Sequence, residues 1–201
     1  MLKHLLLLFV LALPMSASAQ SSILVFGDSL SAGYGIAVEQ SWPALLARRL
    51  ENNRPPWSVS NASISGETTA GGRARFAAAL DRVRPAVVVL ALGANDGLRG
   101  LPPVQMRDNL LAMIRAAKQR QARVLLVGMK LPPNYGPDYP RRFEQTFARV
   151  ADEEKVALLP FLLAPIAADP GAFQPDGLHP TAAAQPRLLE HVWSSLKPLL
   201  K

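Results

Sequence analysis

The chain has 201 residues and a formal net charge of +7, with 49% hydrophobic and 18% charged residues. Few charges and many apolar side chains favour a buried core, which excludes a disordered chain, and the length fits a single domain. The sequence has no cysteine, which excludes disulfides, thiol catalysis and metal sites built on cysteine.

The positive charge is spread along the chain and is not gathered in one segment. Arginines often stand in pairs, as at Arg48 and Arg49 or Arg141 and Arg142, and no run of five basic residues occurs. Solvated helix faces explain this spacing better than a nucleic-acid site, so no nucleic-acid partner is expected. We expect at most a weak attraction to an anionic membrane surface.

Residues 1–19 have the features of a secretory leader. Lys3 precedes an apolar run over residues 5–13, and residues 17–19 (Ala-Ser-Ala) form a small-residue cleavage signal. The run is shorter than the stretch of about 20 apolar residues that spans a bilayer, although an uncleaved anchor is the alternative. We therefore expect a cleaved signal peptide, a single domain over residues 20–201 and a periplasmic location, with secretion as the alternative.

Apolar runs and segments of helical periodicity alternate along the rest of the chain. The run over residues 86–92 (AVVVLAL) has no polar alternation, which predicts a strand covered on both faces and hence a parallel sheet. Strands are predicted at residues 23–26, 57–64, 86–92, 124–129 and 156–162, and helices from residue 42 and at 69–83, 104–121, 142–154 and 181–200. Strands that alternate with helices favour a doubly wound α/β sheet.

Two further details follow from the proline and glycine content. Pro160 interrupts the last predicted strand, which suits the edge of a sheet. Residues 132–140 are rich in proline, tyrosine and glycine and are predicted to form a long loop, which is a candidate functional segment. A solvated connector is the alternative for this loop.

Ser29 stands where the first predicted strand ends, at the sheet edge where ligands bind in open α/β folds. A serine nucleophile needs a base, and residues 20–201 contain two histidines. His191 lies beside Glu190 on the last predicted helix and is interpreted as a surface residue. His179 lies on a turn before that helix, and Asp176 three residues earlier can orient its imidazole. The alternative for Ser29 alone is a helix cap.

An oxyanion hole is the third requirement for acyl transfer. Asn95 follows the third predicted strand directly and can point its amide into the crevice, and Gly66 follows the second strand with a backbone N–H that no side chain covers. Together with the N–H of Ser29 these groups make three donors from three strand ends. An Asn-Asp pair after a strand can also be a simple turn. The rival carboxylates, Asp28 and Asp96, are expected to bond to local backbone.

Four blocks in this order resemble the SGNH/GDSL hydrolase family. The blocks are Gly27-Asp28-Ser29-Leu30, Gly66, Gly93-x-Asn95-Asp96 and Asp176-x-x-His179-Pro180. The resemblance covers the whole chain after the leader, and it looks closest to the bacterial periplasmic thioesterase I, lysophospholipase and arylesterase group. It implies a flavodoxin-like three-layer α/β/α sandwich around a five-stranded parallel sheet.

The same resemblance implies the roles of the site residues. Ser29 would be the nucleophile, His179 the base and Asp176 its partner, while Ser29, Gly66 and Asn95 would donate to the oxyanion. We expect a serine hydrolase of acyl esters and thioesters that acts as a monomer, without a cofactor or a metal.

The segment over residues 131–140, which includes this loop, is expected to line the acyl-binding side of the site and to set the acyl-chain preference, because it follows a strand at the same edge as Ser29. Its candidate chain-contacting residues are Asn134, Tyr135 and Tyr139. A carbohydrate O-deacetylase on the same fold is the alternative enzyme, and a non-catalytic lipid- or membrane-binding protein is the alternative from another class.

Overall fold

The computed structural model describes residues 21–51, 53 and 56–201. The predicted leader, residues 1–19, lies outside these residues. The strands are β1 (Ser21–Gly27), β2 (Trp57–Asn61), β3 (Val87–Ala91), β4 (Arg123–Val127) and β5 (Ala157–Leu159). The helices are α1 (Ser29–Ala32), α2 (Trp42–Leu50), α3 (Thr69–Val83), α4 (Ala94–Leu98), α5 (Pro103–Gln119), α6 (Asp138–Glu154) and α7 (Gln185–Leu196).

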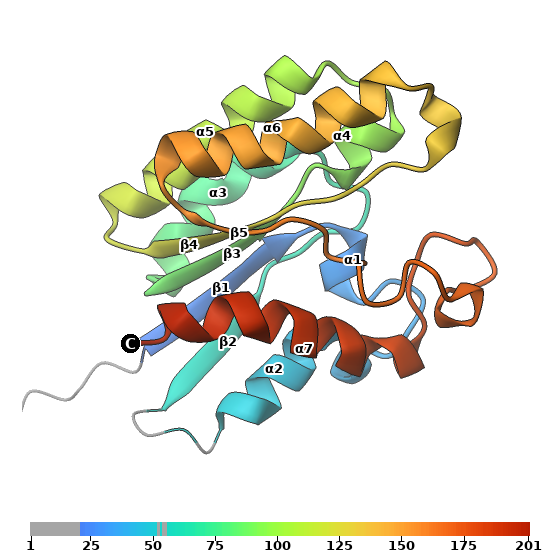
Figure 1. The fold of residues 1–201 in the computed structure, drawn as a ribbon. Helices are drawn as coiled ribbons and strands as arrows, with labels where there is room; N and C mark the ends of the chain where they lie inside the picture. Colours follow the sequence, from blue (N-terminus) through green and yellow to red (C-terminus); the bar gives the residue numbers. More distant parts are fainter. Residues whose placement is uncertain (1–20, 52, 54–55) are drawn as a thin grey trace, which may run out of the picture.

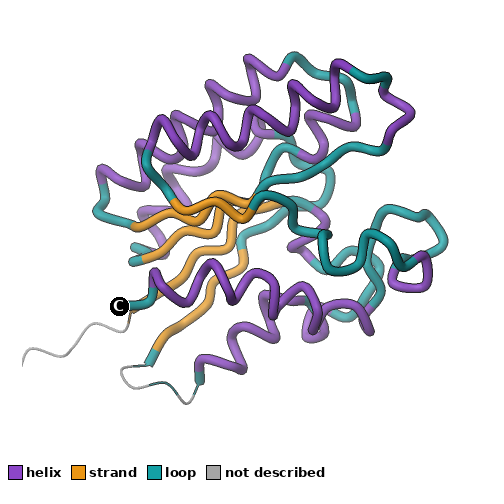
Figure 2. The backbone as a smooth tube through the Cα atoms, viewed as in Figure 1, coloured by secondary structure: helices purple, strands orange, loops and turns teal. Residues whose placement is uncertain are grey.

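The five strands form one parallel sheet in the order β2-β1-β3-β4-β5 (Figures 1 and 2). The predicted α/β/α sandwich with a five-stranded parallel sheet is confirmed. The strand order reverses at β1, which pairs with β2 on one side and β3 on the other. In folds with this order, the crevice at the carboxyl ends of the strands beside the reversal is where ligands bind.

Helices cover both faces of the sheet, with α2 and α7 on one face and α3, α5 and α6 on the other (Figure 1). Successive strand residues therefore enter two different cores. In β1, Ile23 and Val25 belong to the core under α2 and α7, while Leu24 and Phe26 belong to the opposite core. Burial on both faces explains why the strands are continuous apolar runs.

The C-terminal part of the sheet shows how proline shapes the element boundaries. The strand β5 lies at the sheet edge, as predicted, but it ends at Leu159, directly before Pro160. The loop predicted over residues 132–140 is shorter than expected, because α6 already begins at Asp138. Pro140 is compatible with this start, since the first turn of a helix has no internal acceptor for its N–H groups.

Of two other helical predictions, one is adjusted and one is confirmed. The helix predicted at residues 181–200 is a short 3₁₀ turn, then α7, then a second 3₁₀ turn at Lys197–Leu199. The helix α3 spans Thr69–Val83 as predicted, and the Thr68 side chain caps it by accepting from the N–H of Gly71 at 3.3 Å.

Among the described residues, no helix is both long and apolar enough to cross a membrane.

Candidate active site

Ser29 begins α1 immediately after the carboxyl end of β1. The side chain of Asp28 caps this short helix, because its Oδ1 accepts from the N–H of Leu30 at 3.1 Å. Gly33 ends the helix in the left-handed region with φ of 79°, and its N–H donates to the carbonyl of Ser29. The two caps fix the turn on which the Ser29 hydroxyl stands.

The predicted partners of Ser29 meet it in space. The Ser29 hydroxyl lies 2.9 Å from Nε2 of His179, and Nδ1 of His179 lies 2.7 Å from Oδ2 of Asp176. An ionised carboxylate can only accept, so Nδ1 carries the proton and Nε2 is left to accept from the serine hydroxyl. This is the tautomer that a general base needs.

Asp176 stays ionised because three donors converge on it. Its Oδ1 accepts from the N–H groups of His179 at 3.0 Å and Leu178 at 2.9 Å, while Oδ2 faces the imidazole. These hydrogen bonds, led by the backbone N–H of His179, lower the pKa of Asp176 to about 2. The carboxylate is therefore available to orient His179 and to stabilise an imidazolium at any ordinary pH.

The candidate oxyanion donors lie at the ends of neighbouring strands. Asn95 is on α4 after β3, and its Nδ2 donates to the carbonyl of Glu67 at 3.0 Å. That bond uses one of the two amide hydrogens and places Asn95 beside the Glu67–Thr68 peptide, one peptide after the Gly66 carbonyl. Gly66 is exposed with φ of 78°, and its carbonyl accepts from Nη2 of Arg99 at 2.8 Å. The two donor segments are thus tied to each other.

A cavity of about 520 Å³ opens beside Ser29. Asn95 and His179 line it together with Ser29, and Gly66 is not part of its lining. The rest of the wall is mainly apolar and is formed by Leu30, Ala94, Leu98, Met129, Lys130, Leu131, Pro132, Phe161, Leu163, Ala167, Phe173, Gly177 and Leu178. A reactive group in the wall of a mainly apolar cavity suits a substrate with a hydrocarbon chain.

The predicted acyl-chain loop contributes to this cavity through Leu131 and Pro132. Asn134, Tyr135 and Tyr139 do not line it. The hydroxyl of Tyr135 donates to the carbonyl of Leu98 at 2.9 Å, and the hydroxyl of Tyr139 donates to the carbonyl of Leu101 at 2.7 Å. The two tyrosines therefore fasten the segment to the last residue of α4 and to the loop after it. Their influence on chain preference stays a prediction.

Sequence reasoning missed the second apolar wall, which comes from the segment after β5. Phe161, Leu163 and Phe173 belong to it, and this segment has no regular periodicity that would mark an inward face. The one available signal was the apolar cluster that directly follows Pro160. His191 also differs from its prediction, because it is half-buried with Nε2 at 2.9 Å from the carbonyl of Phe161.

The two rival carboxylates are both buried and lie away from the His179 imidazole. Asp96 accepts from the N–H of Thr69 at 2.8 Å and from its hydroxyl at 2.5 Å, so its partner is distant in sequence and not local as expected. Asp28 bonds locally to Leu30, and burial raises its pKa to about 7, with Asp96 and Glu67 contributing repulsion. Neither carboxylate replaces Asp176 as the partner of His179.

Asp28→Asn should make the free energy of unfolding less dependent on pH. The pKa of Asp28 lies above its ordinary value of 3.8 in the folded state, so the folded chain binds this proton more tightly than the unfolded chain. The stability that the proton supplies is present below about pH 4 and is lost as the pH rises toward about 7. Asparagine keeps the acceptor for Leu30 and cannot ionise. The variant should be more stable at pH 8, on the order of 2–4 kcal/mol, and similar at pH 4.

Urea unfolding of both proteins at several pH values measures this difference. If the free energy of unfolding changed with pH to the same extent in wild type and in Asp28→Asn, the assignment of the pH dependence to Asp28 would be contradicted.

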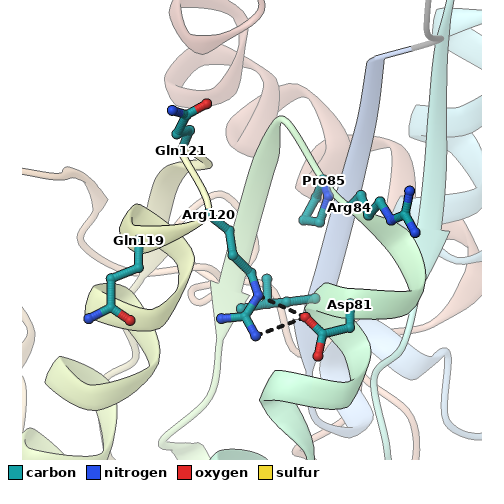
Figure 3. A pocket seen from close by; sticks show the side chains of 7 residues that line it. Asp81, Arg84, Pro85, Gln119, Arg120 and Gln121 are labelled. Atoms are coloured by element: carbon teal, nitrogen blue, oxygen red, sulfur yellow. Dashed lines mark hydrogen bonds and ion pairs between the residues drawn. The ribbon is translucent and has the colours of Figure 1, made fainter.

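A second cavity, of about 560 Å³, lies at the opposite end of the sheet, where α3 and α5 end before β3 and β4 (Figure 3). Arg120 turns toward Asp81, with its Nε 2.9 Å from the carboxylate, while Arg84, Gln119 and Gln121 point away from one another. These side chains do not converge on a common point.

Among the described residues, no group of three or more His, Cys, Asp or Glu side chains could hold a metal ion.

Comparison with known proteins agrees with the geometry at Ser29. Residues 25–186 match the GDSL-like Lipase/Acylhydrolase family. The chain belongs to this family. It is 50% identical over 193 residues to Esterase TesA of Pseudomonas aeruginosa, covering 96% of each chain. It is 40% identical over 197 residues to the Thioesterase 1/protease 1/lysophospholipase L1 of Escherichia coli K12, covering 98% of this chain and 93% of that one.

A solved structure supports the same placement within the GDSL family. The crystal structure of TesA superposes with a TM-score of 0.86 at 51% identity, and the match covers 90% of this chain and 100% of that one. As a member of the GDSL-like lipase/acylhydrolase family, with relatives that match nearly all of the given chain, the protein is a hydrolase.

Proposed function

We propose that this hydrolase cleaves carboxylic esters and thioesters with a hydrocarbon acyl chain, through an acyl-enzyme on Ser29. The observation that carries the proposal is the Ser29–His179–Asp176 chain of hydrogen bonds, at 2.9 and 2.7 Å, whose Ser29 and His179 line a mainly apolar cavity. The names of its relatives, which include an esterase and a thioesterase/lysophospholipase, support the same substrate class.

The first half of the reaction transfers the acyl group to the enzyme. The Ser29 hydroxyl oxygen attacks the substrate carbonyl carbon while Nε2 of His179 takes its proton. The carbonyl oxygen becomes an oxyanion, which the N–H groups of Ser29 and Gly66 and the amide of Asn95 stabilise. The intermediate then collapses, the bond to the leaving alcohol or thiol breaks, and the proton on Nε2 passes to that leaving group.

The second half releases the acid. Water gives a proton to Nε2 of His179 and its oxygen attacks the acyl carbon, which forms a second oxyanion at the same donors. When this intermediate collapses, the bond to Ser29 breaks and the proton returns to its oxygen. Asp176 remains ionised throughout, since its pKa of about 2 lies far below neutral pH. It therefore does not take the proton from His179.

Hydrolysis rates for p-nitrophenyl esters and acyl-CoA thioesters of increasing chain length test the proposal. We expect activity on both linkages and a rise in kcat/KM with the first added methylenes, because the cavity wall is apolar. Acetyl-xylan is the matched comparison. Cleavage of acetyl-xylan with no activity on medium-chain esters would replace the proposal by a carbohydrate O-deacetylase.

Tyr135→Ala and Tyr139→Ala should lower activity more for long acyl chains than for acetyl esters. Each substitution removes a hydroxyl that fastens the Leu131–Pro132 side of the cavity, to the end of α4 for Tyr135 and to the loop after it for Tyr139. A displaced wall loses about 0.8 kcal/mol for each methylene that it no longer covers. The measurement is kcat/KM across the ester series. An equal loss at every chain length, or none at any, would mean that the two tyrosines do not act on chain preference.

We also propose that the mature protein is periplasmic, with residues 1–19 removed on export. The support is the leader pattern of the sequence alone. N-terminal sequencing of the protein recovered from the periplasmic fraction tests this, and an intact Met1 in that material would contradict it.

A further inference from the structure

Gln174 is a half-buried residue near the active site, and it donates hydrogen bonds through both its backbone and its side chain. Its backbone N–H donates to the carbonyl of His179 at 2.8 Å. Its side-chain Nε2 donates to the carbonyl of Pro180 at 3.0 Å and also to the carbonyl of Tyr34 at 2.8 Å. The first two contacts lie within the segment that carries His179, and the third reaches the segment that carries Ser29.

Tyr34 continues this connection to the nucleophile. Its N–H donates to the carbonyl of Ser29 at 3.3 Å, and its ring lies against the His179 imidazole, with the ring centres 4.4 Å apart and the planes tilted by 39°. The path from Ser29 through Tyr34 and Gln174 to His179 therefore closes a loop. This second connection does not use the hydrogen bond between the serine hydroxyl and Nε2.

Gly35 leaves the space that Gln174 occupies. Its φ is 73°, and a Cβ added there would lie 2.1 Å from Oε1 of Gln174. No L-residue side chain fits at this position without moving Gln174. Two features therefore favour glycine at position 35. One is the left-handed backbone of the turn, and the other is the close approach of the Gln174 side chain from the segment that carries His179.

The hydrogen bonds of Asp176 cannot by themselves set the distance between His179 and Ser29. They join Asp176 to Leu178 and His179 within the same exposed segment, so they would move together with it. The Gln174–Tyr34 hydrogen bond joins two segments that are 140 residues apart. A hydrogen bond between the two segments can hold the imidazole at a fixed distance from the serine hydroxyl.

We propose that Gln174 is a positioning residue that, through Tyr34, holds the His179 imidazole within reach of the Ser29 hydroxyl. The proposal rests on the proposed function of Ser29 and His179. A small displacement of a base from its proton donor lowers the rate of the chemical step, by up to about 100-fold for 1 Å, while substrate binding is unchanged.

Gln174→Met is the direct test, because the methionine side chain has a similar length and no N–H donor, while the backbone N–H that bonds to His179 is kept. We expect kcat for a short neutral ester to fall about tenfold or more per active site, with KM within about twofold of wild type. Active sites are counted by reaction with a small alkyl phosphonate run to completion. Counting them separates a positioning role from partial unfolding, which lowers the number of sites and leaves the turnover of each site intact.

Gln185→Met is the matched control. Gln185 also makes a long-range side-chain contact, since its Oε1 accepts from the N–H of Trp42 at 2.9 Å, but this contact lies within the core and away from His179. Its loss should lower the melting temperature and leave kcat per site unchanged. Gly35→Ala is the second test variant, because its Cβ displaces Gln174, and it should reproduce the fall in kcat per site.

An unchanged kcat per site in Gln174→Met and Gly35→Ala would overturn the positioning role. An equal fall in Gln185→Met would also overturn it, since the effect would then follow from lost stability. Failure of the proposed function looks different, because wild type itself would then neither hydrolyse esters nor take up the phosphonate on Ser29.

Discussion

Ser29→Ala and His179→Ala should each reduce ester turnover on the order of 10⁴- to 10⁶-fold, the range found for other Ser–His–Asp hydrolases. The first substitution removes the atom that bonds to the acyl group, and the second removes the base 2.9 Å away. Both side chains line the cavity and are not part of the packed core, so the fold should survive their loss. Steady-state hydrolysis of a p-nitrophenyl ester measures the effect, and circular dichroism confirms the fold.

His191→Ala is the matched control for the base. His191 is the other histidine in the described part of the chain, and its Nε2 bonds to the carbonyl of Phe161. Its removal should leave turnover almost unchanged. If His191→Ala proved as inactive as His179→Ala with the fold intact, the assignment of the base would be wrong.

Asn95→Ala should lower kcat about 10²- to 10³-fold, or roughly 2.7–4 kcal/mol, with little change in KM. The Asn95 amide already donates one hydrogen to the carbonyl of Glu67, which leaves the second free for charge that develops only in the transition state. The measurement is kcat and KM for a short ester. Asn109→Ala is a suitable control, because that amide bonds to Thr69 outside the cavity.

A normal kcat with a raised KM in Asn95→Ala would give Asn95 a different role. It would then contact the substrate equally in the ground state and the transition state, which is uniform binding.

The sheet could be predicted because its strands are buried on both faces. The side chains of residues 87–91 and 124–127 alternate between the two cores, so each strand is an apolar run that no amphipathic helix would show. Once the strands and crossovers are placed, the positions of Ser29, Asn95 and His179 at one edge follow from the topology.

The elements missed from the sequence are those set by tertiary contacts. The helix α4 contains Asn95, Asp96 and Gly97, which favour turns in isolation, and it forms where Asp96 accepts from Thr69. Tyr135 and Tyr139 could be predicted as part of a site loop, but the direction of their side chains could not. The carbonyls that accept from them belong to the last residue of α4 and to the loop after it, which are distant in the sequence. Long-range partners of this kind leave no periodic pattern in the sequence.

Mass spectrometry of the protein after treatment with a small alkyl phosphonate tests the central claim most directly. The hydrogen bond between Ser29 and His179 predicts one phosphonyl group per chain, located on the peptide that contains Ser29, with activity lost in proportion to labelling. Stoichiometric labelling of any other residue together with complete loss of activity, or full activity in a protein labelled at Ser29, would contradict a nucleophilic role for Ser29.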